Sequence, residues 1–194
     1  MWDERYSDSE FVYGTEPNGF LAQVGHQLHG PVLCLADGEG RNSVWLAERG
    51  LDVHAVDASA VGIHKGQQLA ARRGVTVRGI VADLSDFELG SRRWGAIVAI
   101  FAHLPPPLRA RVHAASVAGL APGGHLVLEA YTPRQLAHGT GGPPVLDMLF
   151  EPAVIERELA GLRFEVLREV ERDVIEGEYH TGRAAVLQAF ATKP

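Results

Sequence analysis

The sequence predicts an α/β fold in which helices cover both faces of a mostly parallel sheet. Short apolar runs alternate with helical patterns along residues 31–130. The run at 95–100 is apolar throughout, as expected for a strand covered on both faces. Two strand-like segments joined by a short polar turn occupy residues 163–192. We therefore expect a three-layer, mostly parallel, seven-stranded sheet with an antiparallel C-terminal hairpin.

The individual elements follow from apolar periodicity and from the positions of glycine and proline. Residues 44–47 show a helical pattern that ends at Gly50, and a helix over 58–73 is followed by Gly74. Pro122-Gly123-Gly124 is read as a turn into the next strand. We expect further helices at 108–120 and 152–160, and strands at 31–35, 52–56, 75–81, 95–100, 125–130, 163–173 and 183–192.

Length and composition limit the class of protein. The 194 residues suit a single domain, with an N-terminal region at 1–30 and a core at 31–194. The net charge of −6 argues against a nucleic-acid partner, because phosphate binding needs a basic face. The only cysteine, Cys34, favours a reducing, cytoplasmic location. The sequence shows neither an apolar run of about 18 residues nor a secretory leader, so we expect no membrane partner.

A glycine-containing loop directly follows the first expected strand and opens a helix. It reads Ala36-Asp37-Gly38-Glu39-Gly40-Arg41-Asn42. Gly38 and Gly40 let the backbone turn sharply and approach a ligand where a Cβ would intrude. The free N–H groups at the start of the helix favour a polar or anionic group. Such a glycine pair also occurs in ordinary turns, so the loop needs support from its surroundings.

Acidic residues follow the next two strands. Asp57, about twenty residues beyond the loop, can accept hydrogen bonds from ribose hydroxyls. Asp83 can accept one from an adenine amino group. An aspartate after a strand is also a common helix cap, a role that Ser59 could take instead. Because the ends of adjacent parallel strands converge on one crevice, the loop and both aspartates predict a nucleoside cofactor.

The motifs separate two kinds of nucleoside cofactor. A dinucleotide fingerprint would place a third glycine where this chain has Ser43, which counts against a nicotinamide-dependent oxidoreductase. The set of motifs instead resembles class I methyltransferases, which use S-adenosylmethionine (SAM) and release S-adenosylhomocysteine on a Rossmann-like fold. The core motifs that carry this resemblance are residues 36–42, Asp57, Asp83, 95–100 and 122–124.

The terminal segments indicate a narrower branch. Residues 2–6, 13–21 and 178–183 are similar to tellurite-resistance and thiopurine methyltransferase-like proteins. The resemblance covers nearly the whole chain. It implies methyl transfer from SAM to a small-molecule acceptor, such as a thiol or a metalloid oxyanion like tellurite, by a monomer or homodimer. The alternatives are a SAM-binding module without catalysis and, less favoured by the motifs, the oxidoreductase.

The resemblance also implies a cofactor site, with one departure. The family loop begins with an acid where this chain has Cys34, and Ala36 replaces a glycine. That acid commonly holds the amino-acid end of SAM, and either Asp37 or Glu39 is expected to replace it. Cys34 itself is expected to be a buried strand residue. The expected cofactor-binding residues are Trp2, Tyr6, Tyr13, Ala36, Asp37, Gly38, Glu39, Gly40, Asn42, Asp57, Ala58, Asp83, Leu84 and Phe101.

The acceptor side is expected to contain three catalytic residues. His103 follows the fourth strand and is a candidate general base, although it could equally be a surface histidine. By resemblance, His180 and Arg183 in the hairpin face the acceptor, where an arginine fork suits an oxyanion. A solvated turn is the alternative for both. The other histidines lack metal-ligand spacing, so no metal site is expected.

Aromatic side chains are concentrated near the N-terminus. Trp2, Tyr6, Tyr13 and Phe20 are expected to fold over the cofactor as a lid that excludes water. Packing against the helix that begins near Pro17 would explain Phe20 alone. It would leave Trp2 and Tyr6 without a role.

Overall fold

The computed structural model describes residues 2–8, 10–177 and 181–194, and one seven-stranded sheet organises them. The strand order is β3-β2-β1-β4-β5-β7-β6, and β7 runs antiparallel to both its neighbours. The prediction of a mostly parallel sheet with an antiparallel C-terminal hairpin is confirmed. The strands are β1 (Val32–Leu35), β2 (Val53–Asp57), β3 (Arg78–Val81), β4 (Trp94–Ile100), β5 (Leu120–Tyr131), β6 (Arg163–Ile175) and β7 (Thr181–Thr192).

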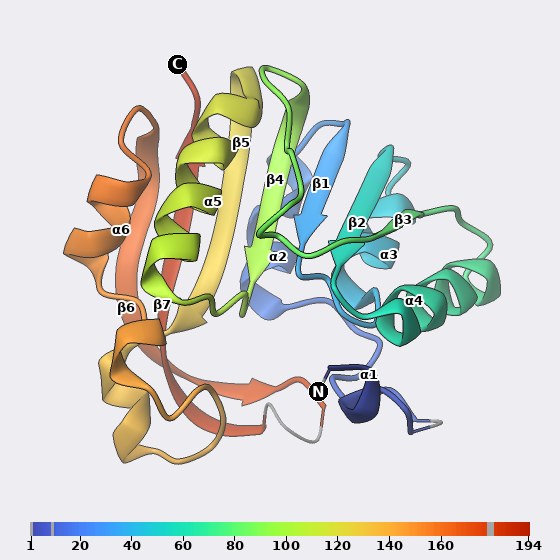
Figure 1. The fold of residues 1–194 in the computed structure, drawn as a ribbon, viewed down its shortest axis with the longest axis horizontal. Coiled ribbons are helices and arrows are strands. Elements are labelled where there is room, and N and C mark those ends of the chain that lie inside the picture. The colour runs from blue at the N-terminus through green and yellow to red at the C-terminus, as the bar shows by residue number, and fades with distance from the viewer. Residues whose placement is uncertain (1, 9, 178–180) are drawn as a thin grey trace.

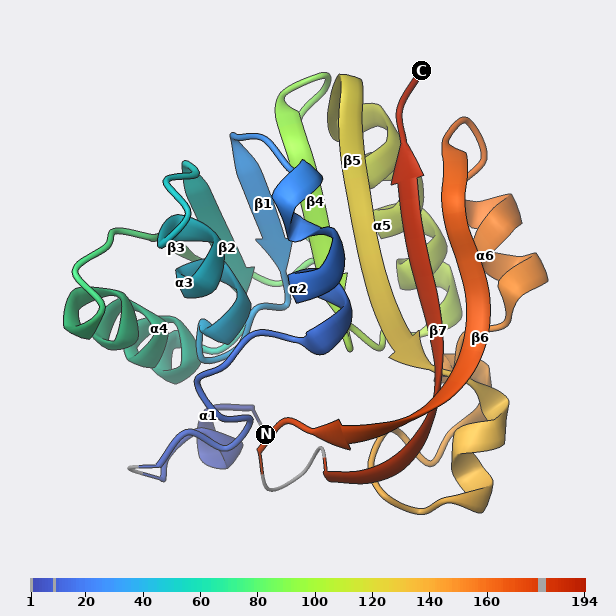
Figure 2. The same cartoon turned by 180° about the vertical axis from the view of Figure 1, so that it is seen from behind.

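Helices cover both faces of this sheet, which gives three layers (Figures 1 and 2). The α-helices are α1 (Trp2–Arg5), α2 (Gly19–Val24), α3 (Arg41–Ala47), α4 (Ala60–Arg72), α5 (Pro106–Gly119) and α6 (Pro152–Glu158). Short 3-10 helices are η1 (Gly25–Gln27), η2 (Pro133–Ala137) and η3 (Leu146–Met148).

Two apolar cores lie on opposite faces of the sheet. Side chains of α2, α3 and α4, including Phe20, Leu46 and Ile63, form one core. Side chains of α5 and α6, including Val112 and Ile155, form the other. Strands β1 and β4 are buried along their whole length between them, which explains their continuous apolar sequences. No helix among the described residues has both the length and the apolar character needed to cross a membrane.

The turn expected at residues 122–124 is instead part of a strand. β5 begins at Leu120 and continues through these residues, with a shift in its register against β4. Gly123 takes a φ of +77°, a conformation that glycine adopts at little cost, and this lets the strand continue past the irregularity. The prediction of a turn before the strand is therefore wrong.

The N-terminal segment meets the end of β6 beyond the carboxyl ends of the parallel strands, whereas the C-terminus lies at the opposite end of the molecule (Figures 1 and 2). Beyond β5, the β6–β7 hairpin curls under the sheet toward the N-terminal segment (Figure 2). The contact is close: a Cβ on Gly177 would lie 2.4 Å from both the Tyr13 Cα and the Val12 carbonyl oxygen. Residues 2–8 and 10–17, together with the described ends of β6 and β7 beside them, form what we call the roof.

Candidate functional site

The glycine loop joins β1 to α3 in a tight, left-handed path. Ala36, Gly38 and Gly40 have φ values of 49°, 60° and 89°. Only glycine fits at position 40, because a Cβ there would lie 2.6 Å from the Gly66 Cα of α4. Ala36 adopts this conformation despite its Cβ, so the loop carries local backbone strain.

Asp57, the last residue of β2, holds this loop in place. Its Oδ2 accepts a hydrogen bond from the Gly38 N–H at 2.9 Å, and its Oδ1 accepts one from the Ser59 N–H at 2.8 Å. Burial raises the pKa of Asp57 above its ordinary value. Ser59, not Asp57, caps α4 by accepting a hydrogen bond from the Gly62 N–H. The carboxylate is therefore free of helix capping and contacts the loop directly.

The β3 end carries the second expected aspartate. Asp83 lies at the surface, where its Oδ1 accepts a hydrogen bond from the Ser85 N–H at 2.7 Å. The hydrogen bonds from Ser85 lower the pKa of Asp83. Leu84 beside it is buried, whereas Ala58 after β2 is exposed. The three segments expected to bind the cofactor therefore follow β1, β2 and β3, which are neighbours in the sheet.

The two acids within the loop have different surroundings. Glu39 is bound by a cation, because its Oε1 lies 2.5 Å from the Lys65 Nζ of α4. Its Oε2 also accepts a hydrogen bond from the Tyr13 N–H. Among the described residues Asp37 has no ion pair, and its Oδ2 accepts a hydrogen bond from the Ser43 hydroxyl. Burial, above all, raises the pKa of Asp37 to about 6, although the nearby Arg41 charge partly offsets this rise.

Lys65 also holds the N-terminal segment against the loop. Its Nζ donates hydrogen bonds to the carbonyl oxygens of Tyr6, Asp8 and Glu10, at 3.3, 2.9 and 2.7 Å. The Tyr6 side chain is buried over Gly38, where an added Cβ would lie 2.8 Å from the Tyr6 hydroxyl. Burial and the nearby Asp57 carboxylate raise the pKa of Tyr6. The segment thus covers the glycine loop.

The remaining aromatic residues expected in a lid have different exposures. Trp2 stacks on Tyr6 with a 5.9 Å separation of ring centroids, yet it stays 42% exposed. Tyr13 meets Tyr6 edge to face. Phe20 is buried in the core under α2, in accordance with the packing alternative. Asn42 Oδ1 accepts a hydrogen bond from the Asn18 N–H, which ties the loop helix to α2.

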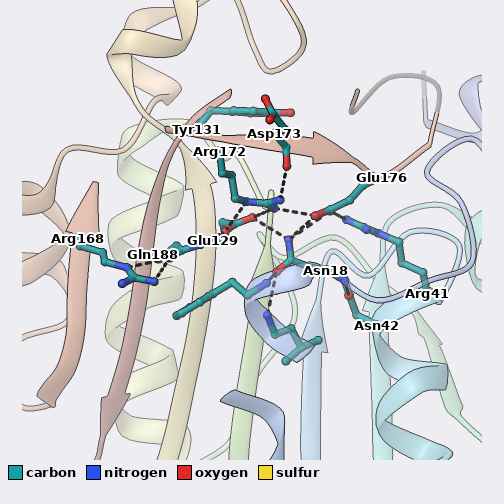
Figure 3. A network of polar contacts seen from close by, with 12 residues as sticks. Asn18, Arg41, Asn42, Glu129, Tyr131, Arg168, Arg172, Asp173, Glu176 and Gln188 are labelled. Carbon is teal, nitrogen blue, oxygen red and sulfur yellow. Dashed lines mark hydrogen bonds and ion pairs between the residues drawn. The ribbon is translucent and has the colours of Figure 1, made fainter. Parts of the chain in front are cut away.

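A buried polar network joins the roof to the sheet (Figure 3). Glu129 of β5 is fully buried and is paired with Arg172 of β6. Glu176 accepts hydrogen bonds from Arg172 and Asn18, and its Oε2 lies 2.7 Å from the Arg41 Nη2. Asn18 also donates to Glu129 at 2.8 Å. We call these five residues the roof network, since they link segments far apart in sequence.

The roof network was not anticipated from the sequence. Glu129 offered one signal, because it is an acid inside the otherwise apolar run 126–130. Arg172 lies in a strongly charged edge strand, where polar residues are ordinary, and Glu176 directly follows that strand. Lys65 occurs on an amphipathic helix, where a lysine is usually solvated. Only the packing of the N-terminal region against the end of β6 distinguishes these residues.

His103 lies near the end of β4 but is engaged at both ring nitrogens. Its Nδ1 lies 2.9 Å from the Met148 carbonyl oxygen, and its Nε2 accepts a hydrogen bond from the Tyr131 N–H at 3.2 Å. These partners define a neutral imidazole protonated at Nδ1. Burial lowers the pKa of His103 to about 4. In this geometry both ring nitrogens of His103 are engaged with the backbone, and its role as a general base stays a prediction.

The other acceptor-side candidates are on the hairpin. Arg183 is half exposed, and its guanidinium lies 3.5 Å from the Glu171 and 3.8 Å from the Asp173 carboxylates across the strand pair. His180 lies outside the described residues. Phe101, at the end of β4, takes a φ of 53° and packs against Tyr131 with ring centroids 4.6 Å apart.

Cys34 has the surroundings of a core residue. It is 1% exposed within β1 and belongs to the core under α2 to α4. Burial raises the pKa of its thiol well above the ordinary value. The expectation of a buried strand residue is confirmed. Among residues 2–8, 10–177 and 181–194, no three His, Cys, Asp or Glu side chains are placed to hold a metal ion.

A second polar cluster lies between α5 and α6. Arg109 donates through Nε and Nη2 to Glu158 and through Nη1 to the Asp147 carbonyl oxygen. The His113 Nδ1 lies 2.7 Å from the Glu158 Oε2. Hydrogen bonds from His113 and Arg109 outweigh the opposing effect of burial and lower the pKa of Glu158 to about 2. This α5–α6 cluster holds α6 and the preceding loop on α5.

Comparison with known proteins adds information at two levels. Residues 32–124 match a family model described as a methyltransferase domain. The 2-heptyl-1-hydroxyquinolin-4(1H)-one methyltransferase of Mycobacteroides abscessus is 32% identical over 120 residues, which cover 60% of this chain and 53% of that protein. The chain thus matches about half the length of this curated relative.

Solved structures share the fold at low sequence identity. A structure from work on the conversion of a disulfide bond into a thioacetal group during echinomycin biosynthesis has a TM-score of 0.80 at 16% identity, over 99% of this chain and 90% of its own. TehB from Haemophilus influenzae has a TM-score of 0.73 at 15% identity, over 100% and 66%. Magnesium protoporphyrin IX methyltransferase from Synechocystis, solved with S-adenosylhomocysteine, has a TM-score of 0.66 at 18% identity, over 90% and 78%.

Proposed function

We propose that this chain binds SAM and transfers its methyl group to a small-molecule acceptor, a proposal supported by the match of residues 32–124 to a methyltransferase domain model. SAM is the cofactor of class I methyltransferase domains. The observation that carries the proposal is the pairing of Asp57 with the Gly38 N–H. It sets an acidic side chain from the second strand against the glycine loop of the first, where an open α/β sheet binds a nucleoside.

The residues of this edge fit the separate parts of SAM. In the proposal, Asp57 accepts hydrogen bonds from the ribose hydroxyls, while Asp83 and Leu84 contact the adenine. Asp37 faces the ammonium group, because Glu39 is already paired with Lys65. SAM supplies a methyl group activated by a sulfonium. Alignment of the acceptor and exclusion of water then provide most of the catalytic effect.

The N-terminal segment acts as a lid in this proposal. Tyr6 lies over Gly38 and near Asp57, so SAM entry requires residues 2–17 to lift from the glycine loop. Lys65 holds the closed position through three carbonyl oxygens. Closure over bound SAM would exclude water from the reacting methyl group.

The surroundings of His103 favour an acceptor that is already ionised near neutral pH. Both of its ring nitrogens are engaged with the backbone, so in this geometry neither is placed to remove a proton from an alcohol or amine. A thiolate or a metalloid oxyanion such as tellurite needs little activation, and an acidic N-hydroxy heterocycle like that named for the curated relative belongs to the same group. His180 and Arg183 remain the proposed acceptor-binding residues. The likeness to TehB supports the tellurite-resistance branch only at the level of fold.

Titration calorimetry with SAM and NADH tests the cofactor. Micromolar binding of SAM supports the proposal, whereas binding of NADH alone contradicts it in favour of an oxidoreductase. Mass spectrometry after incubation with SAM and a panel of thiols, tellurite and hydroxyquinolones tests methyl transfer. Binding of SAM without methylation of any member would favour the non-catalytic module. We further propose a cytoplasmic monomer or homodimer without a nucleic-acid partner, which the net charge of −6 supports.

A further inference from the structure

The Arg41 side chain has a buried donor without an acceptor. Arg41 opens α3 directly after the glycine loop, and its side chain is only 7% exposed. Its Nη2 is paired with Glu176, but its Nη1 has no hydrogen-bond partner among the residues that the structure describes. Leaving a charged donor buried and unpaired costs about 1–3 kcal/mol or more. Native proteins rarely keep such a group without a functional reason.

The neighbouring carboxylates are already occupied. Glu176 accepts hydrogen bonds from Asn18 and Arg172 besides its pair with Arg41. Glu129 accepts from Asn18 and Gln188 and is paired with Arg172. Figure 3 shows the Arg41 guanidinium on the side of Glu176 away from Arg172, toward the helix that follows the glycine loop. An acceptor for Nη1 must therefore come from outside the network.

We propose that Arg41 binds the carboxylate of the methionine part of SAM through Nη1, while Nη2 remains on Glu176. The planar guanidinium fork suits a carboxylate, and the charge makes the hydrogen bond about twice as strong as a neutral one. Asp37, four residues earlier on the same loop, faces the ammonium in the function proposed above, on which this inference rests. The two charges of the amino-acid end thus have separate partners on one loop.

This arrangement also connects the cofactor to the hairpin. Arg41 contacts Glu176, which is bound to Asn18 of the N-terminal region and to Arg172 of β6. A carboxylate on Nη1 would satisfy this buried donor of Arg41 and hold its guanidinium against Glu176. Cofactor binding and closure of the roof then strengthen each other.

A ligand–protein double-mutant cycle tests the contact. SAM and its decarboxylated form, S-adenosylmethioninamine, differ only in the carboxylate, and calorimetry gives the dissociation constant of each. We expect the wild-type protein to bind SAM about 10- to 100-fold more tightly, as one charge-assisted hydrogen-bonded contact provides. Arg41→Met should bring the two dissociation constants to within about twofold, because neither ligand then has the partner.

Arg172→Met is the matched control, since it removes the other arginine bound to Glu176. It should keep the preference for SAM. Loss of the preference in Arg172→Met as well would show that Arg41 acts only through the network and would overturn the inference. If Arg41→Met binds neither ligand, Arg41→Lys is measured in its place. Its ratio of the two dissociation constants should lie between the wild-type ratio and a ratio of one, which means no preference.

The outcomes separate this inference from the proposed function. A wild-type protein that binds neither ligand would contradict the proposed function. A wild-type protein that binds both equally, or an Arg41→Met variant that keeps the full preference for SAM, would leave the function standing. Either of these last results would overturn the role of Arg41.

Discussion

The roof network and the α5–α6 cluster are both buried and charged, but they differ in how completely they are satisfied. In the α5–α6 cluster, every guanidinium nitrogen of Arg109 has an acceptor on Glu158 or Asp147. In the roof network, Arg41 keeps a buried Nη1 that has no hydrogen-bond partner in the described part of the chain. The α5–α6 cluster links elements of the apolar core that α5 and α6 form on one face of the sheet. The roof network links the glycine loop, the N-terminal region and the hairpin around the proposed cofactor site.

This difference suggests how to distinguish structural from functional polar groups. A fully satisfied cluster contributes to stability, and its loss should change folding without changing ligand binding. A cluster that leaves a buried charged donor unpaired has given up stability, as sites that receive a ligand commonly do. The predictions below test that distinction.

The largest expected effect is on the roof network. Glu129→Ala removes a fully buried carboxylate and leaves Arg172, Asn18 and Gln188 without a common acceptor. Breaking a buried ion pair from one side costs about 3–5 kcal/mol. Denaturant titration should show a loss of this size in the free energy of unfolding. A change below about 1 kcal/mol would mean that the network is not formed in solution.

The α5–α6 cluster should lose less stability and no cofactor affinity. Glu158→Gln keeps one acceptor for Arg109 and His113 but removes the charge, at an expected cost of about 2 kcal/mol. The folded-state pKa of Glu158 is lowered to about 2, so its contribution is fully present above pH 4.5 and is lost as the pH falls toward 2. Urea titrations across this window should show a shallower decline in the variant. A reduced SAM affinity would contradict the distinction.

Asp57→Ala should weaken SAM binding by about 1–3 kcal/mol. The ribose would lose its proposed acceptor, and the Gly38 N–H would lose the carboxylate that accepts its hydrogen bond. Asp83→Ala is the control from the same edge of the sheet; it removes an exposed carboxylate and should have a smaller effect. Calorimetry measures both. Unchanged affinity in Asp57→Ala would exclude Asp57 from the cofactor site.

The affinity for SAM should fall at acidic pH. The pKa of Asp37 is raised to about 6, and only the ionised carboxylate attracts an ammonium group. The dissociation constant should rise by up to about tenfold per pH unit below 6. Asp37→Asn should bind weakly and without this slope. The free energy of unfolding should depend on pH in the opposite direction. Because the folded-state pKa of Asp37 is raised, its contribution to stability is present below pH 3.8 and is lost as the pH rises through 6. Asp37→Asn should therefore be more stable than the wild type at pH 7.

The smallest expected effect is on the lid. Lys65→Met keeps the length of the side chain but removes the donor to Tyr6, Asp8 and Glu10, together with the cation that is paired with Glu39. Hydrogen exchange in residues 2–13 should become roughly 5-fold faster, which corresponds to about 1 kcal/mol. Exchange in β1 and β4 provides the internal control and should not change. Equal acceleration throughout the chain would indicate global destabilisation instead of lid opening.

Local pattern was a good guide to the fold but a poorer one to the site. The continuous apolar strand β4 and the glycine loop before α3 were predictable, since burial and backbone conformation leave a direct trace in sequence. Asp57 and Asp83 were placed at the correct strand ends for the same reason. His103 was expected as a base, yet its partners, the Met148 carbonyl and the Tyr131 N–H, are far from it in sequence. Its protonation state could not be inferred before packing.

By itself the sequence determined the order of strands and helices, the hairpin at the C-terminus and the acids that follow β2 and β3. These depend on periodicity and on neighbours within a few residues. Only the tertiary structure decided that Glu39 is paired with Lys65, on which the proposed role of Asp37 rests, and that Arg41 is buried beside Glu176. Charge pairing depends on which distant side chains share a buried site, and no local pattern records that.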